Sequence, residues 1–342
     1  MQKKINERNV SLDLLRIFFC YCIIILHESG FIIDYPIKWT SFQLMVRPAL
    51  FAFVSISGYF LLNSCDISNT KKFYIKRLST LVIPLVIYSI LIQFAANIID
   101  KQGFFYGFSK DFWVNIYSGR ITSHLWFVYS MIALYIVTPY IKIFLDKLNN
   151  KQLIVFLVLI FFFIGINPIL DYYGYGTTIT IIFANSMFFY YVLGYLISKI
   201  DFTNRKIGSI AVLEIISIVS VMLYFRKQLY IQTTLWTTSI FMVIGVVFYF
   251  ALAEFLTDKI PGLFNKTISF ISARTYSIYI IHFFILQQLA NSHTFKYTQS
   301  NAIYLVLLKS LIIFSISLVV TIIVDLLVVN SFKKINNKLF LK

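Results

Sequence analysis

Charged residues are scarce in this chain. Only 13% of its 342 residues are Asp, Glu, Lys or Arg, whereas 59% are hydrophobic, and the mean hydropathy is +0.81. Soluble globular proteins carry about 25% charged residues, so this composition excludes a soluble domain. Only an all-α polytopic protein, a bundle of transmembrane helices, fits it. The 36 Phe and 23 Tyr residues are typical of helix contacts and of the belts at membrane surfaces.

Cysteine and several catalytic motifs are also scarce or missing. The three cysteines, Cys20, Cys22 and Cys65, show no metal-ligand spacing, and two of them lie inside the first apolar run, which favours buried structural thiols. Four scattered histidines without a close pair predict no metal site. The sequence has no G-x-S-x-G elbow, no phosphate loop and no dinucleotide fingerprint, so nothing supports the chemistries that use them.

Acidic residues are outnumbered by basic ones, 14 to 30, which gives a net charge of +16. The charges form short clusters between apolar runs rather than a continuous basic face. This pattern is typical of topology signals, and it predicts a lipid bilayer rather than nucleic acid as the partner. Lys3, Lys4 and Arg8 precede an apolar run that is too long for a signal peptide and lacks a small-residue cleavage site, so we expect a retained first span.

Ten apolar runs are each near the roughly 20 residues that a membrane-crossing helix needs. The expected spans are 10–33, 41–62, 78–99, 123–144, 152–168, 178–198, 207–225, 234–256, 268–290 and 302–330, of which the last is long enough to begin or end as an interfacial helix. With the N-terminus inside, cytoplasmic segments hold 19 Lys and Arg residues and outside segments hold 7, so both termini are expected in the cytoplasm. We expect one integral-membrane domain over residues 1–342, crossing the cell membrane many times.

The first run carries two groups that are costly in lipid, Arg16 and His27. Eleven residues separate them, close to three helical turns, so both side chains leave the same face about 16 Å apart along the axis. Such groups must face a protein interior or a wet cavity. This face, with Glu28 beside His27, is the first candidate for the working site.

Two later runs also carry histidines. Tyr279 and His282 are three residues apart and share a face of the ninth expected span. His282 lies about 21 Å and His27 about 25 Å from the cytoplasmic side by helical rise, so the two imidazoles can meet in the outer half of the membrane. His124 and Trp126 open the fourth span, where either site lining or anchoring in the outer aromatic belt is expected.

Two basic features have alternative interpretations. Arg47 lies in the second span before Pro48, where the helix is expected to start or kink, and it either lines the site or reaches the outer headgroups. Just downstream, Gly58 favours close helix packing. The basic cluster before the third span either faces anionic lipid or forms a cytoplasmic seat for a phosphorylated donor. Its members are Lys71, Lys72, Lys76 and Arg77.

Five segments in order make the sequence resemble the acyltransferase 3 family, ten-span bacterial membrane proteins, over nearly the whole chain. The most specific segment is an arginine and a histidine separated by ten residues. Arg16 and His27 match it within LDLLRIFFCYCIIILH. The others are SISGYFLL (Ser55 to Leu62), HLWFVYSMIALYIVTPY (His124 to Tyr140), FFYYVLGYLIS (Phe188 to Ser198) and SFISARTYSIYIIH (Ser269 to His282).

The resemblance implies transfer of an acyl group, usually acetyl, from acetyl-CoA to a hydroxyl of a cell-surface glycan or a lipid-linked envelope precursor. Acetyl-CoA is then a co-substrate on the cytoplasmic side, with no tightly bound cofactor. His27 is the implied catalytic residue and Arg16 its partner. Of two family arginines before the third span, Arg77 matches the first and Thr80 replaces the second, which leaves Lys76 or Lys72 as substitutes. The extracytoplasmic esterase-like domain of some members is not expected.

The chemistry of these residues agrees, since a neutral imidazole can take the proton of a hydroxyl and nearby positive charge stabilises a developing oxyanion. His27 is then a general base or a transient acyl carrier. Two other classes remain open. A transporter or flippase for a lipid-linked sugar would need no acyl donor, although no internal repeat is evident. A receptor or structural partner would tolerate substitution of Arg16 and His27.

Overall fold

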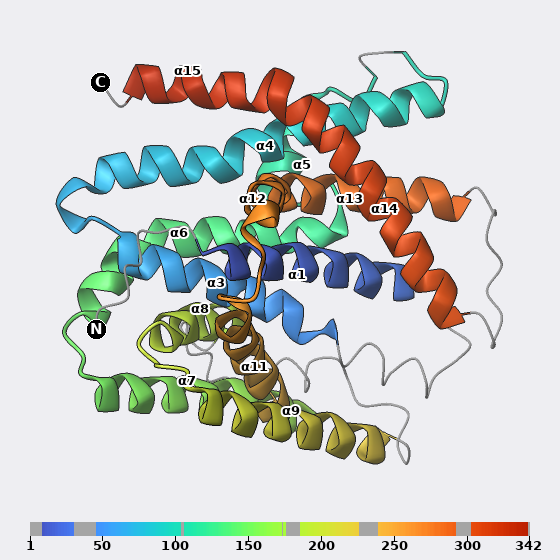
Figure 1. Ribbon diagram of the computed structural model, residues 1–342. Coiled ribbons are helices and arrows are strands. Elements are labelled where there is room, and N and C mark those ends of the chain that lie inside the picture. The colour runs from blue at the N-terminus through green and yellow to red at the C-terminus, as the bar shows by residue number, and fades with distance from the viewer. Residues whose placement is uncertain are drawn as a thin grey trace.

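The computed structural model describes residues 9–30, 46–103, 106–172, 174–175, 185–225, 239–291 and 302–340. Within these ranges every regular element is a helix, and no strand occurs (Figure 1). The predicted all-α fold is therefore confirmed for the described part of the chain. Segments 31–33, 41–45, 178–184 and 234–238 of the expected spans lie outside the described residues.

Most helices overlap an expected span. The helices are α1 (Val10–Ser29), α3 (Pro48–Ser64), α4 (Thr70–Ile99), α5 (Lys110–Ser118), α6 (Trp126–Leu145), α7 (Asn150–Tyr172), α8 (Ser186–Ile197), α9 (Asn204–Phe225), α11 (Ile240–Leu256), α12 (Asn265–Ser272), α13 (Thr275–Asn291), α14 (Ala302–Val324) and α15 (Asn330–Phe340), with a π-helical turn at Asp325–Val329. However, α4 begins at Thr70 rather than at 78, and α5 and all of α15 except its first residue lie outside the expected spans. As predicted, the helix after Arg47 starts at Pro48, whose fixed φ suits a first helical position.

Four helical stretches in the described residues are long and apolar enough to cross a bilayer. These are Val10–Ser29, Ile67–Ile99, Ser123–Leu145 and Ala302–Asn336, and the pair α12 and α13 adds a fifth if it forms one bent span. Shorter apolar helices occupy four other expected spans, namely Pro48–Ser64, Asn150–Gly165, Ser186–Ile197 and Ile240–Leu256. The structure thus supports a membrane protein with four or five spans by length, and the count of ten and the cytoplasmic termini stay predictions.

The expected span 268–290 is not one straight helix. It bends by 57° between α12 and α13, at Ala273 and Arg274. The Arg274 side chain folds back over α12, where its guanidinium donates to the carbonyl of Phe270 at 2.7 Å and lies 3.6 Å from the centre of that ring. Hydrogen bonds from α12 to α1 hold the bend, since Ser272 donates to Asp13 at 2.8 Å.

The last expected span, 302–330, also changes direction. After α14 the chain passes through the π-helical turn and continues as α15, which runs beside α4 (Figure 1). Asp325 in that turn is buried and accepts hydrogen bonds from Tyr88 at 2.9 Å and Ser277 at 3.0 Å. These bonds join the π-helical turn after α14 to α4 and α13, so the buried carboxylate holds this turn against both helices.

Two glycines allow α3 and α8 to touch backbone to backbone. A Cβ at Gly58 would lie 1.9 Å from the Tyr191 carbonyl oxygen, and one at Gly194 would lie 1.9 Å from the Ser55 carbonyl oxygen. The close approach lets the Ser55 hydroxyl donate to the carbonyl of Tyr190 at 2.8 Å. The expectation that Gly58 permits close packing is confirmed.

The first helix is central in the bundle. It packs against α3, α11, α12, α13 and α14, and it lies in the middle of the helices in Figure 1. Cys20, Cys22 and, on the segment after α3, Cys65 are free and buried, as predicted. Four polar side chains of α1 are buried in protein, namely Ser11, Asp13, Glu28 and Ser29.

Candidate functional site: a buried histidine cluster

Three histidine rings meet in the interior. His27 comes from α1, His282 from α13 and His124 from the short 3₁₀ turn that precedes α6. Ring centroids are 5.3 Å apart for His27 and His282, 5.1 Å for His124 and His282, and 6.0 Å for His27 and His124. The expected meeting of His27 and His282 is thus present in the structure. We call these three residues the histidine cluster.

The three rings differ in exposure. His282 is 0% and His124 2% exposed, whereas His27 is half-buried. An incoming molecule can therefore touch His27 before either of the other two rings. His124 is buried beside the other two rings, so its side chain is not exposed as a belt anchor would be, and its role in lining the site stays a prediction.

Backbone carbonyls of α13 hold the two inner rings. His282 Nδ1 lies 2.6 Å from the carbonyl oxygen of Tyr279, and His124 Nε2 lies 3.2 Å from that of Ile280. The Tyr279 hydroxyl donates to the carbonyl of His124 at 2.5 Å. This bond fixes the backbone of His124 against α13. The ring of Tyr279, a predicted lining residue, lies beside His124 and His282.

An aromatic residue that sequence analysis missed covers the cluster. The ring of Phe283 stacks on His124, with centroids 4.8 Å apart, and meets His27 edge-on at 5.5 Å. In the sequence Phe283 is one of many phenylalanines in apolar runs, so no signal set it apart. Its position keeps one side of the cluster apolar.

Glu28, the predicted neighbour of His27, forms a buried ion pair with Lys309 of α14. The two charged groups are 2.5 Å apart, and the side chains are 1% and 5% exposed. Lys309 lies within the expected span 302–330, and no sequence feature indicated its partner. The signal that could have found the pair is depth, because both residues lie near the same end of their spans and a buried cation needs a carboxylate.

Arg16 lies apart from the histidine cluster, about 16 Å from His27 along α1 by helical rise. Its guanidinium pairs with Asp13 at 3.1 Å and lies 5.0 Å from the centre of the Phe60 ring. Asp13 is buried and also accepts the bond from Ser272. Asp13 was missed, although a carboxylate three residues before an arginine on a helix is a recognisable pair.

Arg77 of α4 is half-buried. It and Arg16 both lie near Tyr135 of α6, which places the two arginines at the same end of α1. Thr80 is exposed and its hydroxyl donates back to the carbonyl of Lys76 at 2.7 Å, so it does not serve in place of a second arginine. Lys76 is exposed as well.

For Trp126 and Arg47, two other predicted lining residues, a place at the histidine cluster stays a prediction. Trp126 is 48% exposed, and Arg47 is half-buried one residue before α3. Among the described residues, no group of three His, Cys, Asp or Glu side chains is arranged to hold a metal ion.

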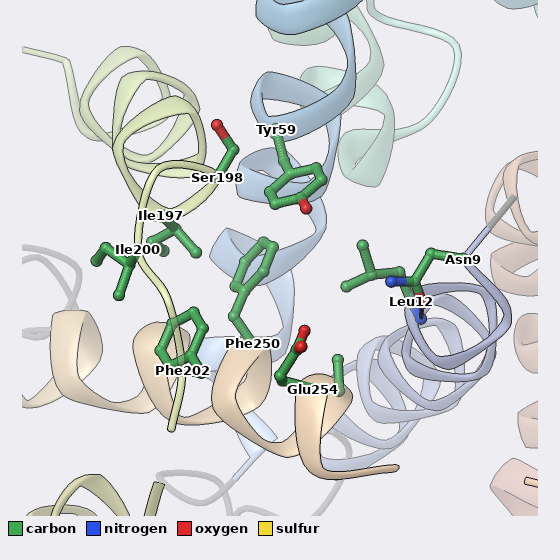
Figure 2. A pocket seen from close by; sticks show the side chains of 10 residues that line it. Asn9, Leu12, Tyr59, Ile197, Ser198, Ile200, Phe202, Phe250 and Glu254 are labelled. Carbon is green, nitrogen blue, oxygen red and sulfur yellow. Dashed lines mark hydrogen bonds between the residues drawn. The ribbon is translucent and has the colours of Figure 1, made fainter. Parts of the chain in front are cut away.

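A small cavity opens near the N-terminal end of α1, between α1, α3, α8 and α11 (Figure 2). It measures about 20 Å³, enough for one water molecule. Its lining residues are Asn9, Leu12, Tyr59, Ile197, Ser198, Ile200, Phe202, Phe250, Ala253 and Glu254. No residue of the histidine cluster lines it, so it is a separate feature at the Arg16 end of the molecule.

Comparison with known proteins agrees with the resemblance drawn from the five motifs. The family model described as an acyltransferase domain, that of the acyltransferase 3 family, matches residues 9–328. No curated protein and no solved structure matches the chain. The matched range contains Arg16, Arg77 and all three residues of the histidine cluster. The chain therefore belongs to the acyltransferase 3 family.

Proposed function

We propose that this membrane acyltransferase uses acyl-CoA, most simply acetyl-CoA, to acylate a hydroxyl of a cell-surface glycan or of a lipid-linked envelope precursor. Family membership supports acyl transfer, and the donor, the acyl group and the acceptor are our proposal. The observation that carries it is His27, an accessible imidazole on the central helix that is packed against two buried imidazoles. The site lies in a multi-pass protein of the cell membrane.

In the proposed reaction His27 is the general base. A bare ring nitrogen takes the proton of the acceptor hydroxyl while the oxygen attacks the thioester carbonyl. The tetrahedral intermediate then collapses, the C–S bond breaks, and the imidazolium returns the proton to the leaving thiolate. The products are an O-acyl ester and free CoA, and His27 ends in its starting state.

The donor would bind along the length of α1. Arg77 and Arg16 provide positive charge at one end of that helix, where charge-assisted hydrogen bonds can hold phosphates. His27 lies about 16 Å further along from Arg16. A donor with phosphates at one end and a thioester at the end of a slim arm fits this separation, and with the N-terminus in the cytoplasm the charged end stays on the side where acyl-CoA is found.

Mass spectrometry of envelope glycans from cells with and without the gene tests the function. We expect an acyl mass increment that depends on the gene and disappears in His27→Ala, while the variant protein still accumulates in the membrane. Val158→Ala, 60% exposed on α7, is the control and should retain the increment. Full acylation by His27→Ala would contradict the role of His27, and transfer of a lipid-linked sugar without an acyl donor would show a transporter instead.

A further inference from the structure

Two ring nitrogens of the histidine cluster are buried without a hydrogen-bond partner among the described residues. They are Nε2 of His282 and Nδ1 of His124. Their side chains are 0% and 2% exposed, so bulk water does not satisfy them. Buried polar atoms are nearly always paired, and an open pair at one place indicates a missing partner.

The protonation of the two unpaired nitrogens follows from the hydrogen bond that the other nitrogen of each ring makes. His282 Nδ1 and His124 Nε2 each face a backbone carbonyl, which can only accept a hydrogen bond. Each of these nitrogens must therefore carry the proton. In a neutral imidazole the other nitrogen is then a bare lone pair, and burial favours the neutral ring. Both open atoms are hydrogen-bond acceptors, fixed in that state by α13.

The missing partner must donate a proton. His27 packs against both inner rings, whereas the nearby Tyr279 hydroxyl already donates to the His124 carbonyl. A neutral His27 has one N–H, and no hydrogen bond of its ring occurs within the described residues. A ring nitrogen lies about 1.1 Å from the ring centre, so two imidazoles joined by an N–H···N bond of about 3 Å have centres roughly 5 Å apart. The 5.3 Å between the ring centres of His27 and His282 is the spacing that such a bond needs. The bond itself is absent from the structure, and a rotation of the His27 ring would bring its N–H onto His282 Nε2.

We propose that His282 is a positioning residue for His27, and that the two inner histidines form a pair of fixed acceptors at the reaction site. His282 Nε2 accepts the N–H of His27, which leaves the other nitrogen of His27 bare toward the alcohol. His124 Nδ1 accepts a second donor of that alcohol, such as a neighbouring hydroxyl. The site then selects sugars and other polyols over simple alcohols. This inference rests on the proposed function.

Amide substitutions separate this role from a purely structural one. At position 282, Gln places an amide near the open Nε2, whereas Asn places one only near Nδ1, where it can still bond the Tyr279 carbonyl. At position 124 the relation is reversed: Asn reaches the open Nδ1 position, and Gln reaches the Nε2 position that bonds Ile280. We therefore expect kcat/KM for acyl transfer to be about tenfold higher in His282→Gln than in His282→Asn. For the same reason it should be about tenfold higher in His124→Asn than in His124→Gln. If the rings serve only to bond α13, both orders reverse, and that outcome overturns the proposal.

A second measurement does not use the reaction at all. The full-length protein, labelled with ¹⁵N-histidine and placed in lipid bilayers, contains only four histidines, so its ring signals can be assigned with single variants. We expect neutral rings of opposite tautomer at His282 and His124, and a His27 N–H signal that shifts in His282→Asn. A charged inner ring, the same tautomer at both positions, or an unmoved His27 signal contradicts the inference. Wild-type protein without acyl transfer but with these signals contradicts the proposed function alone.

Discussion

The ammonium of Lys309 lies 2.5 Å from the carboxylate of Glu28, the residue that follows His27. The pair joins α14 to α1 beside the histidine cluster, and both side chains are almost fully buried. Removing one of the two charges is therefore expected to destabilise the protein more than removing both, because a buried charge without its partner is costly.

Lys309→Met should lower the free energy of unfolding by about 3–5 kcal/mol, since it leaves a buried carboxylate without its cation. Adding Glu28→Gln should recover much of that loss. Thermal unfolding of the purified single and double variants measures the coupling. Leu311→Met, exposed on the same helix, is the control. Additive effects of the two substitutions on the free energy of unfolding would show that Glu28 and Lys309 are not energetically coupled.

Asp13→Asn should impair acyl transfer more than it impairs folding. The amide can still accept the bond from Ser272, but it no longer attracts the Arg16 guanidinium. We expect KM for acyl-CoA to rise about tenfold, because a charge-assisted hydrogen bond contributes roughly 1.5–3 kcal/mol. Titration of the donor against purified protein gives the value. An unchanged KM would mean that Arg16 does not need Asp13 to contact the donor.

Arg77→Gln should also raise KM for acyl-CoA about tenfold, since it removes a half-buried cation at the proposed phosphate end. Lys76→Gln, one residue earlier and exposed, should change KM by less than about twofold, the size typical of an exposed charge. The two variants are compared in the same donor titration. Equal effects would favour the alternative that the whole basic cluster acts through its charge alone.

Gly58→Ala should prevent α3 and α8 from reaching their observed contact. The added Cβ meets backbone atoms of α8, which cannot rotate away, so we expect a loss of about 3 kcal/mol or more and little protein in the membrane. Gly208→Ala on α9 is the matched control, because nothing lies within 4 Å of its Cβ and alanine is the better helix former. Normal accumulation of Gly58→Ala would show that the helices can separate without cost.

Sequence reasoning reached the parts of the site that depend on one helix at a time. Helical period placed Arg16 and His27 on one face of α1, and depth from the membrane surface brought His27 level with His282. Which helices are neighbours is a property of packing, and it does not appear in the period of any single run. For that reason the Glu28–Lys309 ion pair and the packing of Phe283 on the cluster were missed. For His124, the sequence could not decide between anchoring in the aromatic belt and lining the site.

The bend before α13 was hidden for a related reason. Apolar residues continue through positions 268–290, so the hydrophobic pattern predicts one span. The break depends on Arg274 folding back over Phe270 and on Ser272 bonding Asp13 of a distant helix. The second contact joins residues 259 positions apart in the chain, and the local sequence carries no sign of it.

The elbow at Ala273 and Arg274 gives α13 a pivot close to the reactive chemistry. His282 is only seven residues from the start of that helix, about 10 Å from the pivot by helical rise. Tilting α13 by about 6° would displace the ring by about 1 Å, enough to break or form one hydrogen bond. The contact on the α12 side of the elbow, between Ser272 and Asp13 at the opposite end of α1 from His27, therefore helps to set the direction in which α13 carries His282.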